Sequence, residues 1–594
     1  MPMIRSLLTA CTVTVLAASQ LYATEARLVA TGAGSDLQED LEAASLALGA
    51  VEEGTTDGQE LIAAAQADYQ RMVAALYENG YFGGVVSIKL DGTEAADVSP
   101  LRRVASVNNI LITVVPGPRY RFSRAQIAPL PRDAEPVEGY RVGETATTPV
   151  IRRAAQDGVD DWREAGHAKA DVAGQDIVAE HANATVRSRI DLAPGPFLRF
   201  GRALLSERSQ TSAVRQERIL AIAGIPTGEA FSPQEVREAQ RRLRRTGAFR
   251  SAVVDEAEVP NRDGSLDMIV DVEDTLPRRF GFGLELSSDE GAAANAYWLH
   301  RNLFGGAERF RIDGDVSGVG GDSGGIDYGL TAQLTRPAFL HPDNDARFRI
   351  TLEHNDEPAY VSDLFEAIAG VQRYFSEDLT GEFGLGVRFA RVEDAYGERN
   401  FNHVLGRGDL TWDRRDDELD PRSGYYTEVG AIPFLGIDGS ESGARLSTDL
   451  RAFYSFSERF TLAGRVQAGS VLGASIEGTP PEFLFFSGGG GTVRGQDYQS
   501  LSGAIVAGQP VGGRSFLGLS GEIRAKVTDS IGVVGFVDYG YVSPDPDFSG
   551  GDDHAGAGIG GRYYTPIGPV RFDIAVPISG ESGYGIYVGI GQAF

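Results

Sequence analysis

The chain has 594 residues, which is enough for several domains. Its formal net charge of −28 argues against a nucleic-acid partner, because phosphate binding needs clustered lysine and arginine. The only cysteine, Cys11, lies in a segment that we expect to be removed on export, so the exported chain would have neither a disulfide nor a cysteine-bound metal.

Residues 1–23 are typical of a secretory signal peptide. Arg5 supplies the positive charge, residues 7–18 form a short apolar core, and Leu21-Tyr22-Ala23 is a small-residue cleavage site. The apolar core is too short for a transmembrane helix. A lipoprotein cleavage box is a second interpretation of residues 8–11, but it precedes the end of the apolar core. An exported chain could be a soluble protein or a membrane β-barrel, and hydropathy alone does not distinguish the two.

Residues 24–277 contain three copies of one small α/β pattern, which we call α/β modules, at 24–120, 121–198 and 199–277. In each copy an amphipathic helix ends at or near a glycine and two strands follow. The first two copies close on Pro-Gly-Pro, after which the first strand of the next copy begins. The predicted helices are 61–78, 149–165 and 232–249, and the predicted strands are 81–90, 109–115, 170–180, 185–192, 251–259 and 265–272.

Residues 278–594 are predicted to form an all-β transmembrane barrel. Apolar side chains alternate with small or polar ones, which is the period of a strand with one face in lipid. The clearest examples are the first strand, with Phe280, Phe282, Leu284 and Leu286, and the last strand, 584–594, with Tyr584, Ile586, Val588, Ile590 and Phe594 on one face. A soluble β-sandwich has the same alternation, but export and an aromatic C-terminus favour the membrane. Strands of about 9–11 residues imply an even number between about 12 and 18, and we expect 16 antiparallel strands.

One loop within this half carries an unusual charge. The run Gly488-Gly-Gly-Gly is followed by Val493, Arg494, Gly495 and Gln496. Glycine lets backbone pack where no side chain fits, and a guanidinium held there needs a carboxylate partner. The pattern predicts a loop that folds back into a polar lumen and is held by one charge.

Several motifs together resemble the BamA/TamA family of outer-membrane protein assembly factors, with the TamA branch the most similar. Val493 to Gln496 stands where the family has V-R-G-[FY], so Gln496 replaces the usual aromatic residue. Gly535, Phe536, Asp538 and Gly540 match a G-x-F-x-D-x-G strand with one residue fewer before the phenylalanine. Further matches are Asn302 to Gly306, the segment from Asp413 to Gly424, and the ending from Tyr563 to Arg571. The three α/β modules would then be POTRA-like domains.

The resemblance implies two sites. Arg494 would pair with Asp538 inside the barrel, either as a purely structural tie or as part of client handling. A lateral seam would lie between the first and last strands, where glycine weakens strand pairing. The seam residues are Phe280, Gly281, Gly283, Gly585, Gly589, Gly591 and Phe594. A second interpretation of these glycines is that they only make room for the inserted loop.

The expected function is insertion of β-barrel proteins, autotransporters among them, into the bacterial outer membrane, with residues 24–277 in the periplasm. The partners implied are unfolded barrel clients, the lipid bilayer and an inner-membrane-anchored TamB-like subunit that docks on the first α/β module. No catalytic residue, metal or cofactor is expected, because the seven histidines are scattered and no nucleotide-binding motif is present. A two-partner secretion pore, a passive porin-like channel, and α/β modules that act only as a rigid spacer remain alternatives.

Overall fold

The computed structural model describes residues 24–99, 106–287, 291–321, 324–566, 568–579 and 583–594. The expected signal peptide, including Cys11, lies outside the described residues. The chain forms two compact units, each described by itself below. The first comprises Met1–Arg199, Glu229–Gln234 and Arg262–Ser265, and the second comprises Phe200–Gly228, Glu235–Asn261 and Leu266–Phe594. In the described part of the chain, no helix has the length and apolar character needed to cross a membrane.

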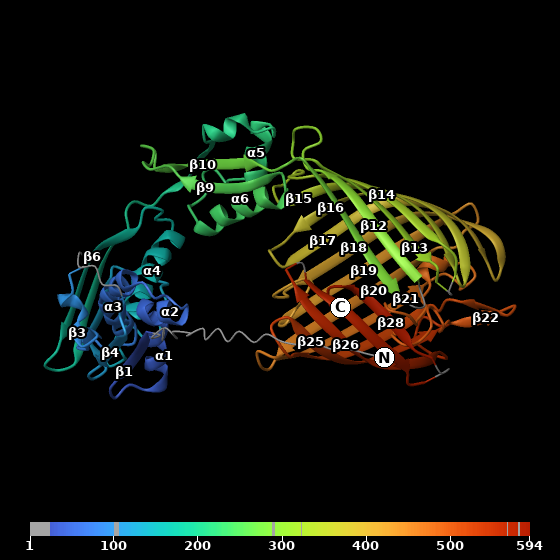
Figure 1. The fold of residues 1–594 in the computed structure, drawn as a ribbon. Coiled ribbons are helices and arrows are strands. Elements are labelled where there is room, and N and C mark those ends of the chain that lie inside the picture. The colour runs from blue at the N-terminus through green and yellow to red at the C-terminus, as the bar shows by residue number, and fades with distance from the viewer. Residues whose placement is uncertain (1–23, 100–105, 288–290, 322–323, 567, 580–582) are drawn as a thin grey trace, which may run out of the picture. The chain divides into compact units, whose positions relative to one another are not determined.

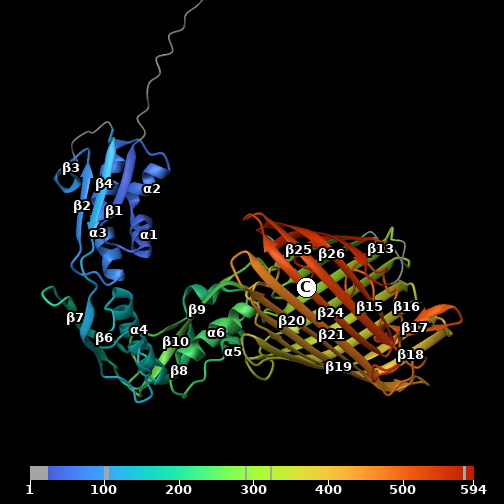
Figure 2. The same ribbon diagram turned by 90° about the horizontal axis from the view of Figure 1, so that it is seen from below.

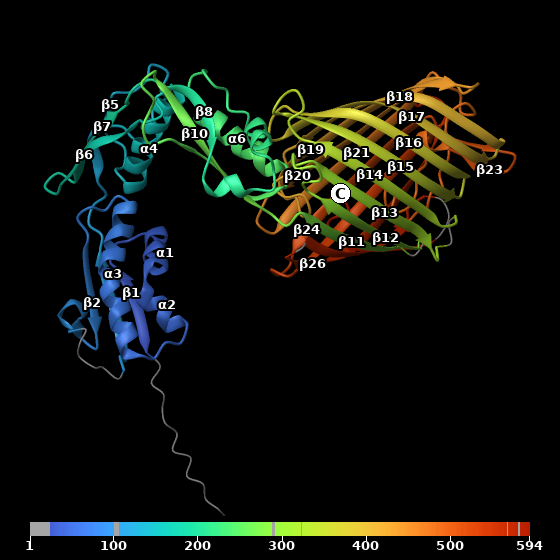
Figure 3. The same cartoon turned by 90° about the horizontal axis from the view of Figure 1, so that it is seen from above.

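The first α/β module packs three helices along a four-stranded sheet (Figures 2 and 3). The sheet order is β1-β4-β2-β3. Its long helix begins where the side chain of Asp57 accepts hydrogen bonds from the first-turn amides of Gln59 and Glu60, which satisfies donors that the helix leaves free. The elements are β1 (Glu25–Ala30), α1 (Ser35–Ala44), α2 (Leu46–Glu52), α3 (Gly58–Glu78), β2 (Val85–Leu90), β3 (Thr93–Glu94), η1 (Ala95–Asp97) and β4 (Asn109–Val115).

The second and third α/β modules repeat the plan with three-stranded sheets, ordered β5-β7-β6 and β8-β10-β9. The three predicted helices are α3, α4 and α6, whereas β1, α1, α2 and α5 were not predicted. The second module has β5 (Arg121–Ala128), α4 (Thr148–Glu164), β6 (Asp171–Glu180) and β7 (Thr185–Ala193). The third has β8 (Arg199–Leu205), η2 (Arg208–Thr211), α5 (Gln216–Ala223), α6 (Pro233–Arg245), β9 (Phe249–Glu256) and β10 (Ser265–Asp274).

Sixteen described strands close into an antiparallel barrel, which confirms the predicted fold class and strand number (Figure 1). They are β11 (Arg278–Ser287), β12 (Gly291–His300), β13 (Arg309–Val319), β14 (Asp327–Arg336), β15 (Asn344–Glu357), β16 (Tyr360–Tyr374), β17 (Leu379–Asp394), β18 (Gly397–Asp413), β19 (Gly424–Ile437), β20 (Gly443–Ser455), β21 (Phe460–Leu472), β24 (Ser515–Lys526), β25 (Ile531–Ser543), β26 (Asp552–Thr565), β27 (Gly568–Pro577) and β28 (Gly585–Ile590). Apolar side chains face outward: Phe282, for example, is 86% exposed. A small hairpin, β22 (Ala504–Val506) with β23 (Gln509–Val511), extends from the end of the barrel opposite the third α/β module (Figures 1 and 3).

Arginines on α6 hold the third α/β module to turns at one end of the barrel. Arg242 donates from Nε and Nη2 to the two carboxylate oxygens of Asp343, at 2.7 and 3.0 Å. Burial by itself would raise the pKa of Asp343, but the hydrogen bonds from Arg242 outweigh it and the pKa lies below its ordinary value. Arg241 pairs with Glu377 at 2.6 Å, and Arg245 stacks on the ring of Tyr374 at 3.5 Å. These contacts mark the module-bearing end of the barrel.

We expect Arg242→Ala to loosen this attachment, because it leaves the mostly buried Asp343 carboxylate without its bidentate partner. Breaking such a pair costs about 3 kcal/mol. Hydrogen exchange of the α6 amides and of the turn before β15 should therefore become at least tenfold faster. Arg250→Ala is the matched control, since Arg250 is exposed and pairs with Glu273 inside the module. Equal hydrogen-exchange rates in both variants would contradict the conclusion that Arg242 attaches the third α/β module to the barrel.

Candidate functional site

A long loop between β21 and β24 folds back into the barrel. Val493 on this loop is fully buried, and the loop passes so close to the wall that two glycines are required. Gly495 has φ +91°, and a Cβ there would lie 2.8 Å from the backbone of Val576. A Cβ on Gly540 would lie 2.2 Å from the hydroxyl of Ser487. Within the glycine run, a Cβ on Gly488 (φ +117°) would lie 2.0 Å from the carbonyl oxygen of Asp497, whereas a Cβ on Gly491 would meet nothing within 4 Å.

Arg494 projects from this loop onto the barrel wall and makes charge-assisted hydrogen bonds. Its Nε and Nη2 donate to Oδ2 and Oδ1 of Asp538 at 2.7 and 3.0 Å, which is the bidentate geometry that suits a guanidinium. The backbone amide of Arg494 also donates to Asp538, at 3.2 Å. Nη1 donates to Glu522 at 2.9 Å and to Asp573 at 3.4 Å. The guanidinium also lies 3.5 Å from the ring centre of Phe536.

The buried ions around Arg494 form a charge-balanced cluster, which we call the lumenal cluster. It consists of Arg494, Arg524, Arg562, Glu522, Asp538 and Asp573, each no more than 4% exposed. Arg524 donates to the second oxygen of Glu522 at 2.9 Å, and Arg562 pairs with Asp573. Three cations therefore face three anions, so no member is left with an uncompensated charge in a place shielded from water.

The residues after β28 turn inward and join the lumenal cluster. Arg524 donates to the carbonyl of Phe594 at 3.1 Å, and Arg562 donates to the side chain of Gln592 at 2.7 Å. The ring of Phe594 packs 6.5 Å from that of Phe453, a buried residue of β20. The predicted last strand, 584–594, is therefore wrong at both ends: it runs from Gly585 to Ile590, and Gly591 at φ +93° begins the inward turn.

Gln496 uses hydrogen bonds where the family motif has an aromatic ring. Its Nε2 donates to the carbonyls of Ala555 and Ser579, at 2.8 and 2.6 Å. These carbonyls lie on β26 and just after β27, so the amide ties the loop to two neighbouring strands. The departure from the motif thus replaces apolar packing with a polar attachment.

The structure brings together most, but not all, of the predicted loop and strand residues. Phe536, Asp538 and Gly540 face the lumen on β25, whereas Gly535 lies on the outward face. Sequence reasoning missed Glu522, Arg524 and Arg562 entirely. These residues could have been found as charged side chains at lumen-facing positions of their strands. That search requires knowing which face of each strand points inward.

The first and last strands of the barrel meet at a short seam. Among the described residues, β11 pairs with β28 only at Leu286↔Val588 and Ser287↔Tyr587. By comparison, β11 pairs with β12 along all 10 of its residues. β28 itself has 6 residues, Gly585–Ile590.

The predicted seam glycines have other roles in the structure. A Cβ on Gly281 would lie 2.2 Å from the ring of Tyr297, and one on Gly283 would lie 2.6 Å from Asn295. These glycines make room for side chains of β12 rather than for the loop, and Gly585 leaves room in the same way for the ring of Tyr587. Phe280 lies on the outward face of β11, and Phe594 lies in the lumen, away from the seam.

An ion pair, which we call the seam pair, crosses this junction inside the lumen. Arg571 of β27 donates from Nη2 to Glu285 of β11 at 2.6 Å, passing over β28. Gly589 stands opposite Arg571 in the strand register, and a Cβ there would lie 3.1 Å from Arg571 Nε. Gly589 therefore provides the gap through which the guanidinium reaches the first strand.

These features define a class of protein. A closed antiparallel barrel with an apolar outer face and a returned loop in its lumen, preceded by small α/β modules, is an outer-membrane β-barrel protein with POTRA-like periplasmic domains.

Residues 302–594, which lie in the barrel half of the chain, match the Omp85 superfamily domain. The outer membrane protein assembly factor BamA of Nitratidesulfovibrio vulgaris is 23% identical over 402 residues, which are 61% of this chain and 47% of that protein. The chain thus spans about half the length of this curated relative.

Two solved structures are similar in fold. BamA from Haemophilus ducreyi lacking POTRA domains 1–3 matches with a TM-score of 0.60 and 16% identity, over 80% of this chain and 100% of that chain. CdiB from Acinetobacter baumannii matches with a TM-score of 0.51 and 12% identity, over 80% of this chain and 90% of that chain.

We expect Arg494→Ala to destabilise the folded barrel, because it leaves the lumenal cluster with an unpaired negative charge. Removing one partner of a buried pair costs about 3–5 kcal/mol. The temperature at which the barrel loses its compact mobility in a detergent gel should fall clearly. For Arg494→Lys this temperature should lie between those of the parent protein and Arg494→Ala, since lysine keeps the charge but not the bidentate geometry.

Arg407→Ala serves as the control for this prediction. Arg407 is also a lumenal arginine, but it pairs with a single carboxylate, Asp409, two residues along β18. If this temperature fell equally in Arg494→Ala and Arg407→Ala, the lumenal cluster would stabilise the barrel no more than an ordinary lumenal ion pair does.

Proposed function

We propose that the protein is an outer-membrane assembly factor that folds and inserts β-barrel clients. The short seam is the observation that carries this proposal. A barrel normally leaves no free strand edge, whereas β11 and β28 share only two register pairs in the described structure. Opening such a seam costs few backbone hydrogen bonds and offers each edge to an incoming strand.

In this mechanism the protein performs no covalent chemistry and needs no nucleotide. The client's first strands would pair with the freed edge by β-augmentation, so that their backbone groups stay bonded on entering the bilayer. The periplasmic modules would act earlier. Their outer strands, such as β6 at the edge of β5-β7-β6, can pair with an extended client in the same way.

The finer parts of the proposal concern the clients and the partner. We infer that autotransporters are among the clients and that a TamB-like subunit anchored in the inner membrane docks on the first α/β module. The three α/β modules and the loop motif support these two inferences.

A secretion pore for one dedicated exoprotein is the second candidate function, favoured by the likeness in fold to CdiB. A passive porin is disfavoured, since the returned loop and the lumenal cluster occupy the barrel interior.

The decisive experiment depletes the protein and measures which outer-membrane proteins are lost, with plasmid-borne variants for rescue. An assembly factor predicts loss of several barrel proteins, whereas a dedicated secretion pore predicts loss of one secreted protein and no barrel. The variant Leu286→Cys with Val588→Cys closes the seam at a directly paired position. This variant should restore the lost outer-membrane proteins under reducing conditions and should not restore them when it is oxidised.

The control for the disulfide is Phe572→Cys with Val588→Cys, which joins the same residue of β28 to its partner on β27 and leaves the seam between β11 and β28 unlinked. It should rescue in both redox states. If the oxidised seam variant also rescued fully, insertion through the seam would be excluded.

The seam pair should set how readily the seam opens. Because Glu285 is 56% exposed, the pair contributes no more than about 1 kcal/mol. Glu285→Gln should therefore speed hydrogen exchange of the β28 amides by about two- to fivefold. The exchange Glu285→Arg with Arg571→Glu should restore slow exchange if attraction across the seam is the cause. If hydrogen exchange stayed fast in this double variant, attraction between the two charges would not be the cause of the slow exchange in the parent protein.

A further inference from the structure

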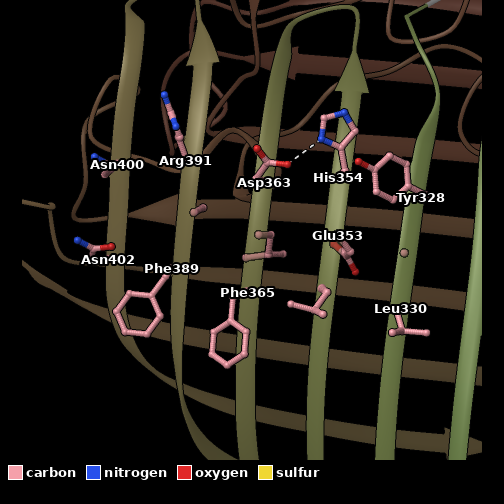
Figure 4. A pocket seen from close by; sticks show the side chains of 14 residues that line it. Tyr328, Leu330, Glu353, His354, Asp363, Phe365, Phe389, Arg391, Asn400 and Asn402 are labelled. Atoms are coloured by element: carbon pink, nitrogen blue, oxygen red, sulfur yellow. Dashed lines mark hydrogen bonds and ion pairs between the residues drawn. The ribbon is translucent and has the colours of Figure 1, made fainter.

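An unusual row of polar side chains crosses the outward face of five neighbouring strands. The strand register places each member directly opposite the next, from β14 to β18. We call this the polar row; its members are Tyr328, His354, Asp363, Arg391 and Asn400. His354 and Asp363 share a hydrogen bond of 2.8 Å, and the rings of Tyr328 and His354 stack at 4.8 Å (Figure 4).

An apolar row lies directly beside the polar row, one step nearer the middle of the barrel wall. Its members are also in register from strand to strand, and they end at Asn402 on β18. They are Leu330, Leu352, Phe365 and Phe389. The two rows line one groove of about 630 Å³ on the outer surface of the barrel (Figure 4).

The length of the strands places the groove at the outer boundary of the membrane. Spanning the hydrocarbon core takes about 9–11 tilted residues. Counted from the module-bearing end, Leu352 is the ninth residue of β15, which begins at Asn344, and His354 is the eleventh. On β17, which begins at Leu379, Phe389 is the eleventh and Arg391 the thirteenth. The apolar row thus reaches the edge of the hydrocarbon, and the polar row lies at headgroup level.

The chemistry of the polar row suits a hydroxyl-rich headgroup better than a phosphate. Its one permanent cation, Arg391, is paired with Glu398, and Asp363 adds a second anion beside it. Phosphate recognition needs an excess of positive charge. Amide and phenol groups, with an aromatic face nearby, are instead able to donate to and accept from sugar hydroxyls. Asn400, Asn402 and Tyr328 supply these groups.

Below the groove, small side chains leave a track along β16. Ala367 and Ala369 stand on the outward face, while Ile368 between them is buried in the lumen. Their register partners are larger: Ile350 and Phe348 on β15, and Val387 and Leu385 on β17. Two small side chains thus stand between larger apolar ones on the way from the groove toward the membrane centre, and an acyl chain laid along them would meet the least obstruction.

We propose that this groove binds one lipid of the outer leaflet, with its acyl chain on the alanine track and an uncharged sugar headgroup on the polar row. The site is independent of the seam and of the lumenal cluster. It adds one specifically bound lipid to the polypeptide partners and the surrounding bilayer expected from the sequence.

Native mass spectrometry of the full chain in a detergent without sugar groups tests the proposal. The probes are a diacylglycerol carrying one glucose and phosphatidylglycerol with the same acyl chains. We expect one glucolipid to stay bound to the parent protein at concentrations where phosphatidylglycerol does not. Asn400→Leu with Asn402→Leu should reduce retention by about three- to tenfold through lost hydrogen bonds. Ala369→Trp should reduce it similarly by filling the track.

Ala557→Trp is the matched control, since Ala557 is an outward-facing alanine on β26, away from the groove. It should retain the glucolipid, and compact mobility in unheated detergent gels should show that all variants are folded. Equal glucolipid retention by the parent protein and both groove variants would overturn the site. Equal retention of phosphatidylglycerol by the parent protein would overturn the headgroup assignment.

Discussion

The bidentate bond between Arg494 and Asp538 is the interaction on which the barrel interior depends. It brings a charge from a loop to the strand wall and holds it where water has little access. Such an arrangement is stable only when every charge is compensated, and the lumenal cluster meets this condition with three arginines and three carboxylates. Through it the loop, the wall strands and the residues after β28 share one network. None of these parts can move far without exposing an unpaired ion.

The same network lies beside the weakest junction of the barrel. On β27, Asp573 belongs to the lumenal cluster, while Arg571, two residues away, reaches over β28 to Glu285. One strand therefore takes part both in the rigid interior and in the closure of the seam. A shift of the loop that pulled on Asp573 would be felt at the seam pair through a stretch of backbone shorter than one strand. This proximity gives the returned loop a physical connection to the seam pair.

The sequence predicted the architecture and part of the site, each for an identifiable reason. Period-two alternation is strong in strands such as β11, and the helices repeat with glycine stops, so the barrel and the α/β modules were predictable. Asp538 became a candidate only through the family motif. Glu522, Arg524 and Arg562 come from other strands, and their meeting depends on which face of each strand points inward. The inward turn at Gly591 was missed because alternation continued through Phe594.

The difference in strand length around the barrel has a consequence for the surrounding bilayer. On the side of the groove, β15 to β18 have 14 to 17 residues, whereas β11 has 10 and β28 has 6. A strand of six tilted residues is too short to match a hydrocarbon core that needs about 9–11. We therefore expect lipids beside β28 to thin or disorder to avoid hydrophobic mismatch, at a cost of fractions of a kcal/mol per Å. The thinnest membrane would then be expected on the side where β11 and β28 share the fewest described pairs.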